Sequence, residues 1–234
     1  MPKALLFDLD GTLIENSMET FLPPYFSALT KKLARWVPPE KLIAQLQSST
    51  RVMMNHDPAR ANAEVFAEDF FPKIGVSREQ LMPLFDEFYA TEYRDLRIFT
   101  KPVEGAREIL SRALELRHPV VIATAPLFPI GALKERLEWG DLADLPFALI
   151  TDYETMHSSK PSPAYYLEIA TRLKCPPEEC VMIGNEVEMD ILPARRAGMK
   201  TFWITDAPEL PTDVPADWRG TLAQLGALLG TDLA

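Results

Sequence analysis

The chain has 234 residues, of which 47% are hydrophobic and 25% charged, so its composition excludes disorder as the main state. Its 24 Lys and Arg residues are outnumbered by 34 Asp and Glu residues, giving a net charge of −10. Because binding to a nucleic-acid backbone requires positive charge, we expect no nucleic-acid partner. The longest uncharged run, residues 118–133, contains three prolines and is shorter than the ~18 apolar residues of a membrane span, so we expect no membrane segment.

The N-terminal segment and the cysteines indicate the compartment. The chain reaches Asp8 and Asp10 after one short apolar stretch, which leaves no room for the apolar segment of about 7–15 residues in a secretory signal. We therefore expect a cytoplasmic protein. Cys175 and Cys180 cannot form a disulfide framework, and no nearby Cys or His completes a zinc site, so two reduced, packed thiols are expected. The sequence leaves the oligomeric state open.

Short apolar runs alternate with helical patterns along most of the chain. Runs at residues 3–7, 119–123, 180–183 and 200–204, with a weaker one at 147–150, predict strands buried on both faces. Helical spacing lies between them at residues 103–114 and 162–173, where Ser162 is the expected N-cap and Pro163 the first helical residue. This alternation predicts an α/β fold, with helices on both faces of a parallel sheet.

The region from residue 17 to about residue 100 has several helical stripes and no convincing strand. Helix starts are predicted at residues 38–39, at residues 57–58 and at Ser77, which forms an expected capping box with Gln80. Pro83 is expected to kink or delay the helix that follows Ser77. We therefore predict a core domain formed by residues 1–16 and 100–234, with a helical domain inserted at residues 17–99.

Two carboxylates follow the first predicted strand, where ligands bind in open α/β sheets. Asp8 and Asp10 are separated by one residue, so both side chains can enter the same crevice while Leu9 turns towards the core. Carboxylates this close repel each other unless a cation or a proton lies between them. The pair therefore predicts a metal site or an acid–base pair, and the alternative is an acidic strand end before an Asp-Gly turn.

Further polar groups follow the later strands. Thr124 and the backbone N–H of Ala125 come after the second strand, and Lys160 lies just before a helix, where an ammonium group would help to hold an anion. Glu186 and Asp190 are four residues apart, so both can lie on one face of a helical turn. Each signal alone has a simpler explanation: a strand-end threonine, a surface lysine, or acids in a first helical turn.

Taken together, these segments resemble the four motifs of the haloacid dehalogenase superfamily. They are residues 8–12, Thr124, Lys160 with Pro161, and residues 184–190. The resemblance implies a Rossmann-like three-layer fold whose helical insertion is the cap of a subclass-one member. It also implies Mg²⁺-dependent phosphoryl transfer through an aspartyl-phosphate.

The resemblance assigns a role to each motif residue. Asp8 would be the nucleophile, and Asp10 would act as acid and then base, with its backbone carbonyl on the metal. Thr124, the N–H of Ala125 and Lys160 would hold the transferring phosphoryl group.

The fourth motif departs from the pattern of many relatives, which carry Asp where this chain has Asn185. Glu186 and Asp190 keep the acid spacing of the family. The expected Mg²⁺ ligands are therefore Asp8, Asp10, Glu186 and Asp190, with Asn185 assisting.

The leading hypothesis is a phosphatase of a small phosphorylated metabolite. A haloacid dehalogenase is the alternative within the superfamily, and Asp10 argues against it because a halide needs no acid to leave. A phosphomutase, or a catalytically weak binding protein suggested by Asn185, are further alternatives. Arg51 and Asn55, beside His56 and Asp57, are candidate substrate contacts in the insertion, and an exposed interhelical loop is the alternative.

Overall fold

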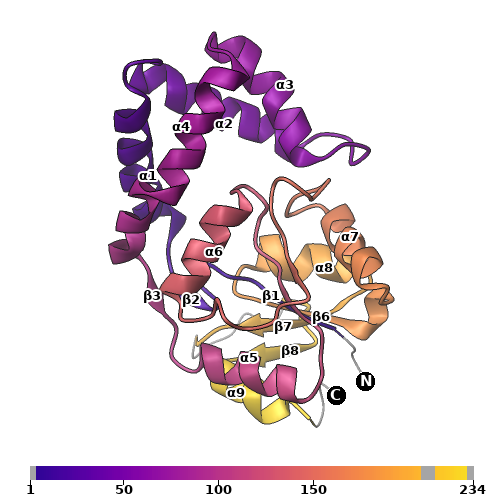
Figure 1. Cartoon of the computed structure of the whole chain (residues 1–234). Coiled ribbons are helices and arrows are strands. Elements are labelled where there is room, and N and C mark those ends of the chain that lie inside the picture. The colour runs from indigo at the N-terminus through magenta and orange to yellow at the C-terminus, as the bar shows by residue number, and fades with distance from the viewer. Residues whose placement is uncertain (1–3, 207–213, 231–234) are drawn as a thin grey trace.

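A six-stranded parallel sheet forms the centre of the computed structural model, which describes residues 4–206 and 214–230 (Figure 1). The strand order is β5-β4-β1-β6-β7-β8, and every neighbouring pair is parallel. The strands are β1 (Ala4–Phe7), β4 (Val120–Ile122), β5 (Leu149–Ile150), β6 (Cys180–Gly184), β7 (Lys200–Ile204) and β8 (Trp218–Gly220). All five predicted strands are confirmed, although Lys3 lies outside the described residues.

The strand β8 was not predicted from the sequence. It has only three residues, and one of them, Gly220, has no side chain to pack and weakens a strand signal. Its position is fixed by pairing with β7, a contact between distant segments that a local pattern cannot reveal.

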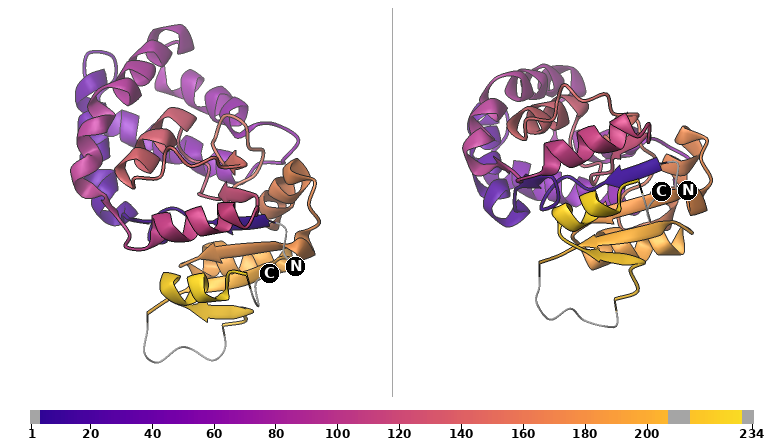
Figure 2. Two further views of the ribbon diagram at one scale, coloured as in Figure 1. Left: turned by 60° about the horizontal axis from the view of Figure 1, so that its bottom comes forward. Right: turned by 90° about the horizontal axis from the view of Figure 1, so that it is seen from below.

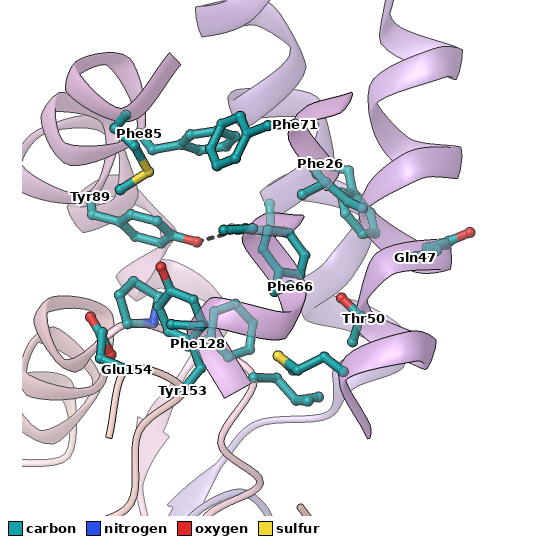
Figure 3. A pocket seen from close by; sticks show the side chains of 18 of the residues that line it. Phe26, Gln47, Thr50, Phe66, Phe71, Phe85, Tyr89, Phe128, Tyr153 and Glu154 are labelled. Carbon is teal, nitrogen blue, oxygen red and sulfur yellow. Dashed lines mark hydrogen bonds between the residues drawn. The ribbon is translucent and has the colours of Figure 1, made fainter. Parts of the chain in front are cut away.

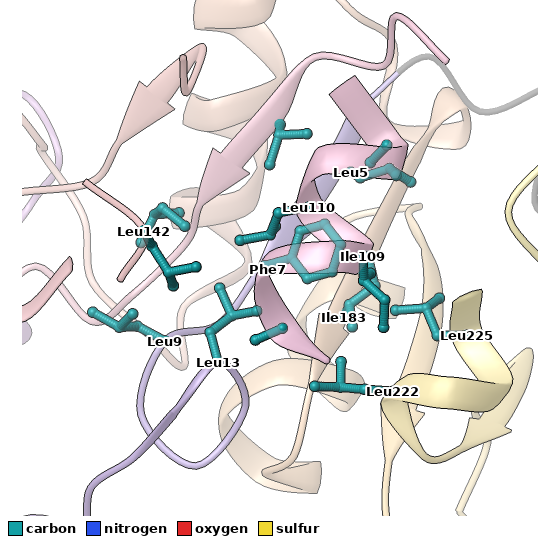
Figure 4. Packing of buried hydrophobic residues seen from close by; sticks show 14 of the residues in the cluster. Leu5, Phe7, Leu9, Leu13, Ile109, Leu110, Leu142, Ile183, Leu222 and Leu225 are labelled. Atoms are coloured by element: carbon teal, nitrogen blue, oxygen red, sulfur yellow. The ribbon is translucent and has the colours of Figure 1, made fainter. Parts of the chain in front are cut away.

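Burial on both faces explains why β1 is apolar at every position. All four of its residues are buried. Leu5 and Phe7 pack on one face with the helices α5 (Ala106–Glu115) and α9 (Leu222–Leu228), as Figure 4 shows. The other face is covered by α7 (Pro163–Leu173) and α8 (Leu192–Arg196), so the fold has three layers, as predicted.

Residues 18–99 form a helical layer beside the carboxyl ends of the strands (Figures 1 and 2). Its elements are α1 (Met18–Leu33), α2 (Pro39–Met54), α3 (Asn62–Ile74), α4 (Arg78–Ala90) and the 3₁₀ helix η1 (Glu92–Phe99). The predicted starts at Pro39 and Ser77 are confirmed, and the Ser77 capping box is present. Helix α4 also runs through Pro83 without a delayed start.

The helix start predicted at residues 57–58 is wrong. Helix α3 begins at Asn62, four residues later. The Asp57 carboxylate accepts a hydrogen bond from the backbone N–H of Ala59, which closes a local turn instead of capping a helix. The short polar side chain of Asp suits both roles, so its presence does not distinguish them.

The chain crosses between the sheet and the helical layer through an antiparallel strand pair, β2 (Ile14–Glu15) and β3 (Lys101–Pro102). Helix α6 (Ile130–Trp139) follows β4 but packs with the helical layer. Its residues Ala132, Leu133 and Trp139 share one apolar cluster with Phe21 and other side chains of residues 18–99. The predicted division into two domains stays a prediction, and the two parts meet through an apolar contact.

Cys175 and Cys180 are free thiols, as predicted, and burial raises the pKa of the Cys180 thiol to about 12. Across residues 4–206 and 214–230, none of the helices combines the length and apolar character required to cross a bilayer.

We expect Leu110→Ala to lower the free energy of unfolding by about 2–5 kcal/mol, because it leaves a cavity between α5 and the sheet. Leu110 is fully buried in the apolar cluster around Phe7 (Figure 4). Urea unfolding measures the change. The matched control is Leu167→Ala on α7, where the side chain is 43% exposed and a change within about 0.5 kcal/mol is expected. Equal losses in both variants would contradict this packing.

Candidate active site

Three charged side chains meet at the carboxyl ends of β1 and β6, and we call Asp8, Lys160 and Asp190 the charge cluster. The Lys160 ammonium donates to Asp8 Oδ1 at 2.7 Å and to Asp190 Oδ1 at 2.6 Å. Asp8 directly follows β1, Lys160 lies in the loop before α7, and Asp190 lies in the π-helical turn η3 (Val187–Ile191). The structure thus brings together residues of three predicted motifs.

Lys160 is only 2% exposed, so its charge depends on its two partners. Burial acts to lower the pKa of Lys160, but the carboxylates of Asp190 and Asp8 outweigh it and hold this pKa well above its usual value. Burial also raises the pKa of Asp190, to about 6, although Lys160 opposes the shift. The ammonium group therefore stays charged and provides a fixed positive charge beside the Asp8 carboxylate.

The backbone at Gly184 explains how Asp190 reaches the charge cluster. A Cβ at position 184 would overlap the Asp190 carboxylate, so only glycine allows the carboxylate to lie against this strand end. Asp190 Oδ2 also accepts a hydrogen bond from the backbone N–H of Glu186 at 3.0 Å. The Glu186 side chain itself is exposed, so of the two predicted acids only Asp190 joins the cluster.

Thr12 connects the first motif to the fourth. Its hydroxyl lies 3.3 Å from Asp8 Oδ2 and 3.1 Å from Asn185 Oδ1, within hydrogen-bonding distance of both. Gly11 has a φ of 81°, and a Cβ there would lie 2.6 Å from Asn185 Nδ2, so glycine is required for both reasons. The Asn185 amide is therefore held close to the Asp8 carboxylate.

Asp10 pairs with a residue that the sequence interpretation missed. The Arg136 guanidinium of α6 forms an ion pair with Asp10 Oδ1, and Arg136 is 1% exposed. Burial raises the pKa of Asp10 to about 6, against the opposing effect of Arg136. The guanidinium also lies 5.2 Å from the ring centre of Phe21 and 5.4 Å from that of Phe128.

A local signal for Arg136 was present in the sequence. Ala132, Leu133, Arg136 and Leu137 have the spacing of one helix face, and all four are buried. A charged residue in an otherwise apolar stripe requires a buried partner of opposite charge. The stripe therefore pointed to a buried ion pair, although it could not identify Asp10 as the partner.

Thr124 lies at the end of β4, where two hydroxyl groups fix its backbone. Thr151 Oγ1 donates to the Thr124 carbonyl at 2.7 Å, and the Tyr165 hydroxyl donates to it at 2.8 Å. Ala125 follows and is half-buried. Thr151 and Tyr165 were not predicted, because their role depends on contacts with a distant strand end.

The residues predicted to contact substrate in the insertion lie at and beyond the end of α2. Arg51 lines a cavity described below, but its side chain is exposed. Asn55 is exposed and donates back to the Arg51 carbonyl at 2.7 Å, and both ring nitrogens of His56 lie within hydrogen-bonding distance of backbone carbonyls. These contacts favour the alternative of an interhelical loop for Asn55 and His56, while Arg51 remains a candidate.

The donor atoms around the charge cluster fit a hard divalent cation. Asp8 and Asp190 supply carboxylate oxygens, and Asn185 supplies an amide oxygen that shares the Thr12 hydroxyl with Asp8. Mg²⁺ takes few protein carboxylates and keeps several waters, so this sparse set suits it. Within the described ranges, no group of three or more His, Cys, Asp or Glu side chains has the geometry of a metal site.

Comparison with known proteins finds phosphatases among the relatives. Phosphoglycolate phosphatase of Xanthomonas campestris pv. campestris is 26% identical over 220 residues, which cover 93% of this chain and 90% of that protein. N-acetylmuramic acid 6-phosphate phosphatase of Pseudomonas aeruginosa is 26% identical over 223 residues, covering 92% and 87%.

Among solved structures, the 2-haloacid dehalogenase from Pseudomonas syringae pv. Tomato DC3000 has a TM-score of 0.62 and 23% identity. The match covers 98% of both chains and shows a shared fold.

The family comparison covers the whole site. The haloacid dehalogenase-like hydrolase family matches residues 2–198, which include β1, the helical layer and every residue of the charge cluster. The chain therefore belongs to the haloacid dehalogenase-like hydrolases.

Proposed function

We propose that the protein is a Mg²⁺-dependent phosphomonoester hydrolase that forms an aspartyl-phosphate on Asp8 and acts on a small phosphorylated metabolite. The observation that carries this proposal is the Asp8 carboxylate held by Lys160, with Asp10 two residues away and Thr124 at the next strand end. The phosphatase activities named for the relatives support it.

The first chemical step is attack of an Asp8 carboxylate oxygen on phosphorus while the ester P–O bond breaks. The phosphate dianion meets like charge at Asp8, so positive groups must lie beside both. Lys160, 2.7 Å from Asp8, provides one such charge on the protein. A bound Mg²⁺ would supply further positive charge to offset this repulsion. Thr124 and the N–H of Ala125 would hydrogen-bond the transferring oxygens.

Asp10 would transfer a proton in both halves of the reaction. In its protonated form it donates to the departing ester oxygen, and the resulting carboxylate then accepts a proton from the water that attacks the aspartyl-phosphate. A pKa of about 6 makes both forms accessible near neutral pH. The ion pair with Arg136 fixes the orientation of this carboxylate. A departing halide needs no such proton, which favours phosphatase over dehalogenase chemistry.

Four groups would hold the metal, with Asn185 assisting. They are the carboxylates of Asp8, Glu186 and Asp190 and the backbone carbonyl of Asp10. Glu186 starts the turn that carries Asp190, and its backbone N–H already bonds to that carboxylate. Its side chain is exposed and would have to turn towards the ion to become a ligand.

We expect Asp8→Asn to abolish phosphomonoester turnover while the far-UV spectrum stays unchanged, because the variant lacks the nucleophile. Removal of divalent metal by EDTA should also stop the wild-type reaction, and added Mg²⁺ should restore it. Steady-state phosphate release measures both effects. The matched control is Asp141→Asn, an exposed position with a φ of 57° that Asn accepts readily. An active Asp8→Asn variant would contradict the mechanism.

We expect Asp10→Asn to slow hydrolysis of an alkyl phosphate by roughly 10²–10⁴-fold, since general acid–base catalysis typically contributes that much. The loss in the rate of phospho-enzyme formation should be smaller for 4-nitrophenyl phosphate, whose leaving group needs no proton. Rapid-quench measurements compare the two esters.

Arg136→Met provides a further control on Asp10. If Arg136 acts by orienting Asp10, the double variant with Asp10→Asn should lose little more than Asp10→Asn alone. Arg136→Lys, which keeps the charge, should recover part of the rate. Equal losses for both esters in Asp10→Asn would show that Asp10 is not the acid.

We expect Glu186→Gln to raise the half-saturating Mg²⁺ concentration by about tenfold or more, because Mg²⁺ has few protein carboxylates to lose. Asn185→Asp, which adds a carboxylate beside Thr12, should preserve or lower it. Activity titrations with Mg²⁺ measure these values. Glu188→Gln is the matched control, since Glu188 is an exposed acid in the same turn. If Glu186→Gln behaves like Glu188→Gln, Glu186 is not a metal ligand.

A further inference from the structure

A cavity of about 610 Å³ lies between the helical layer and the loops that follow β4 and β5 (Figure 3). Aromatic side chains form much of its wall, and they come from α1, α3, α4 and the loop after β4. They include Phe26, Phe66, Phe71, Phe85, Tyr89 and Phe128. A cavity of this volume is within the range that holds drug-sized ligands.

Three of the polar side chains that line the cavity, those of Tyr25, Tyr89 and Glu154, are already paired with the protein. The hydroxyl groups of Tyr25 and Tyr89 hydrogen-bond to each other at 2.8 Å. The Glu154 carboxylate accepts from the backbone N–H of Ile130, with both oxygens within 3.2 Å. Arg51 and Arg78 also line the cavity, but both are exposed residues. The interior therefore offers mainly ring faces and edges to a ligand.

The cavity is linked to the proposed reaction centre through the loop after β4. Leu127, Phe128 and Pro129 line the cavity and follow Thr124 within five residues. The Phe128 ring lies 5.4 Å from the Arg136 guanidinium, which in turn pairs with Asp10. One side chain thus separates the cavity from the ion pair of the expected general acid.

We infer that this cavity receives the leaving group of the phosphomonoester, and that this group carries an aromatic ring. The inference rests on the proposed function. A ring would pack against the aromatic walls with the offset or edge-to-face geometry that such pairs prefer. A short leaving group bearing a carboxylate would gain little from these rings, and the two arginines that line the cavity, Arg51 and Arg78, are exposed and already solvated. The structure therefore favours aromatic substrates over the two-carbon acid in the name of the phosphoglycolate phosphatase relatives.

The test compares two alkyl phosphates that differ only by a ring, 2-phenylethyl phosphate and ethyl phosphate. Their leaving alcohols have similar intrinsic reactivity, so a difference in kcat/KM reports binding of the ring. We expect kcat/KM to be at least about tenfold higher for 2-phenylethyl phosphate, since filling an apolar pocket changes kcat/KM by 10–200-fold for about one methylene. Equal values for the two esters would overturn the inference and leave the proposed function intact.

Variants that fill the cavity provide the second arm. Ala63 and Ala67 line it from α3, so Ala63→Phe and, separately, Ala67→Phe place a ring inside. Each should lower kcat/KM for 2-phenylethyl phosphate about tenfold and change that for ethyl phosphate less than about twofold. Ala90→Phe, at the exposed end of α4 and outside the cavity lining, should change neither. Parallel losses for both esters in both filled variants would overturn the inference.

Failure of the proposed function would give a different experimental result. If wild-type protein with Mg²⁺ hydrolyses neither ester, the phosphatase proposal falls. Calorimetric binding of the same two esters then decides the ligand class of the cavity. If only 2-phenylethyl phosphate binds, and Ala63→Phe abolishes this binding, the inference that the cavity takes an aromatic ligand stands. If binding does not depend on the ring, that inference is rejected.

Discussion

The whole site depends on one buried ammonium group held between two carboxylates. Removing Lys160 from water is strongly unfavourable unless charged partners surround it, and Asp8 and Asp190 meet this requirement at 2.7 and 2.6 Å. Asp8 lies 152 positions before Lys160 in the chain, and Asp190 lies 30 positions after it. The parallel sheet brings them together, because β1 and β6 are neighbours whose carboxyl ends lie at one edge. The ion pairs of Lys160 therefore both connect the ends of β1 and β6 and place a positive charge beside Asp8.

Residues whose role is local were predictable from the sequence. Apolar runs identified the strands, and the pattern at Ser77 identified a capping box. A strand end identified Asp8, and a predicted helix start identified Lys160. Where two local structures use the same residue type, prediction failed, as at Asp57, which closes a turn and does not start a helix. Helix α1 contains two consecutive prolines, so its continuity depends on packing around residues such as Phe21 rather than on propensity.

Contacts that cross from one layer to another could not be predicted. The apolar stripe around Arg136 indicates that its charge is buried, but only the folded chain identifies Asp10 as its partner. Thr151 and Tyr165 likewise act on the backbone of Thr124, which is 27 and 41 positions away. Sequence motifs thus located the proposed reacting groups, whereas the residues that contact and orient them became visible only through tertiary structure.

Helix α6 has a mechanical consequence for substrate entry. It carries Arg136 towards Asp10 on the sheet and buries Leu133 and Trp139 among the helices of residues 18–99. The chain connects the two parts through β2 and β3. If those helices moved away from the sheet as a rigid body, either this apolar contact would be exposed to water or α6 would move with them. In the second case Arg136 would leave Asp10, so an open molecule would lack the ion pair that orients the Asp10 carboxylate, and only closure would restore it.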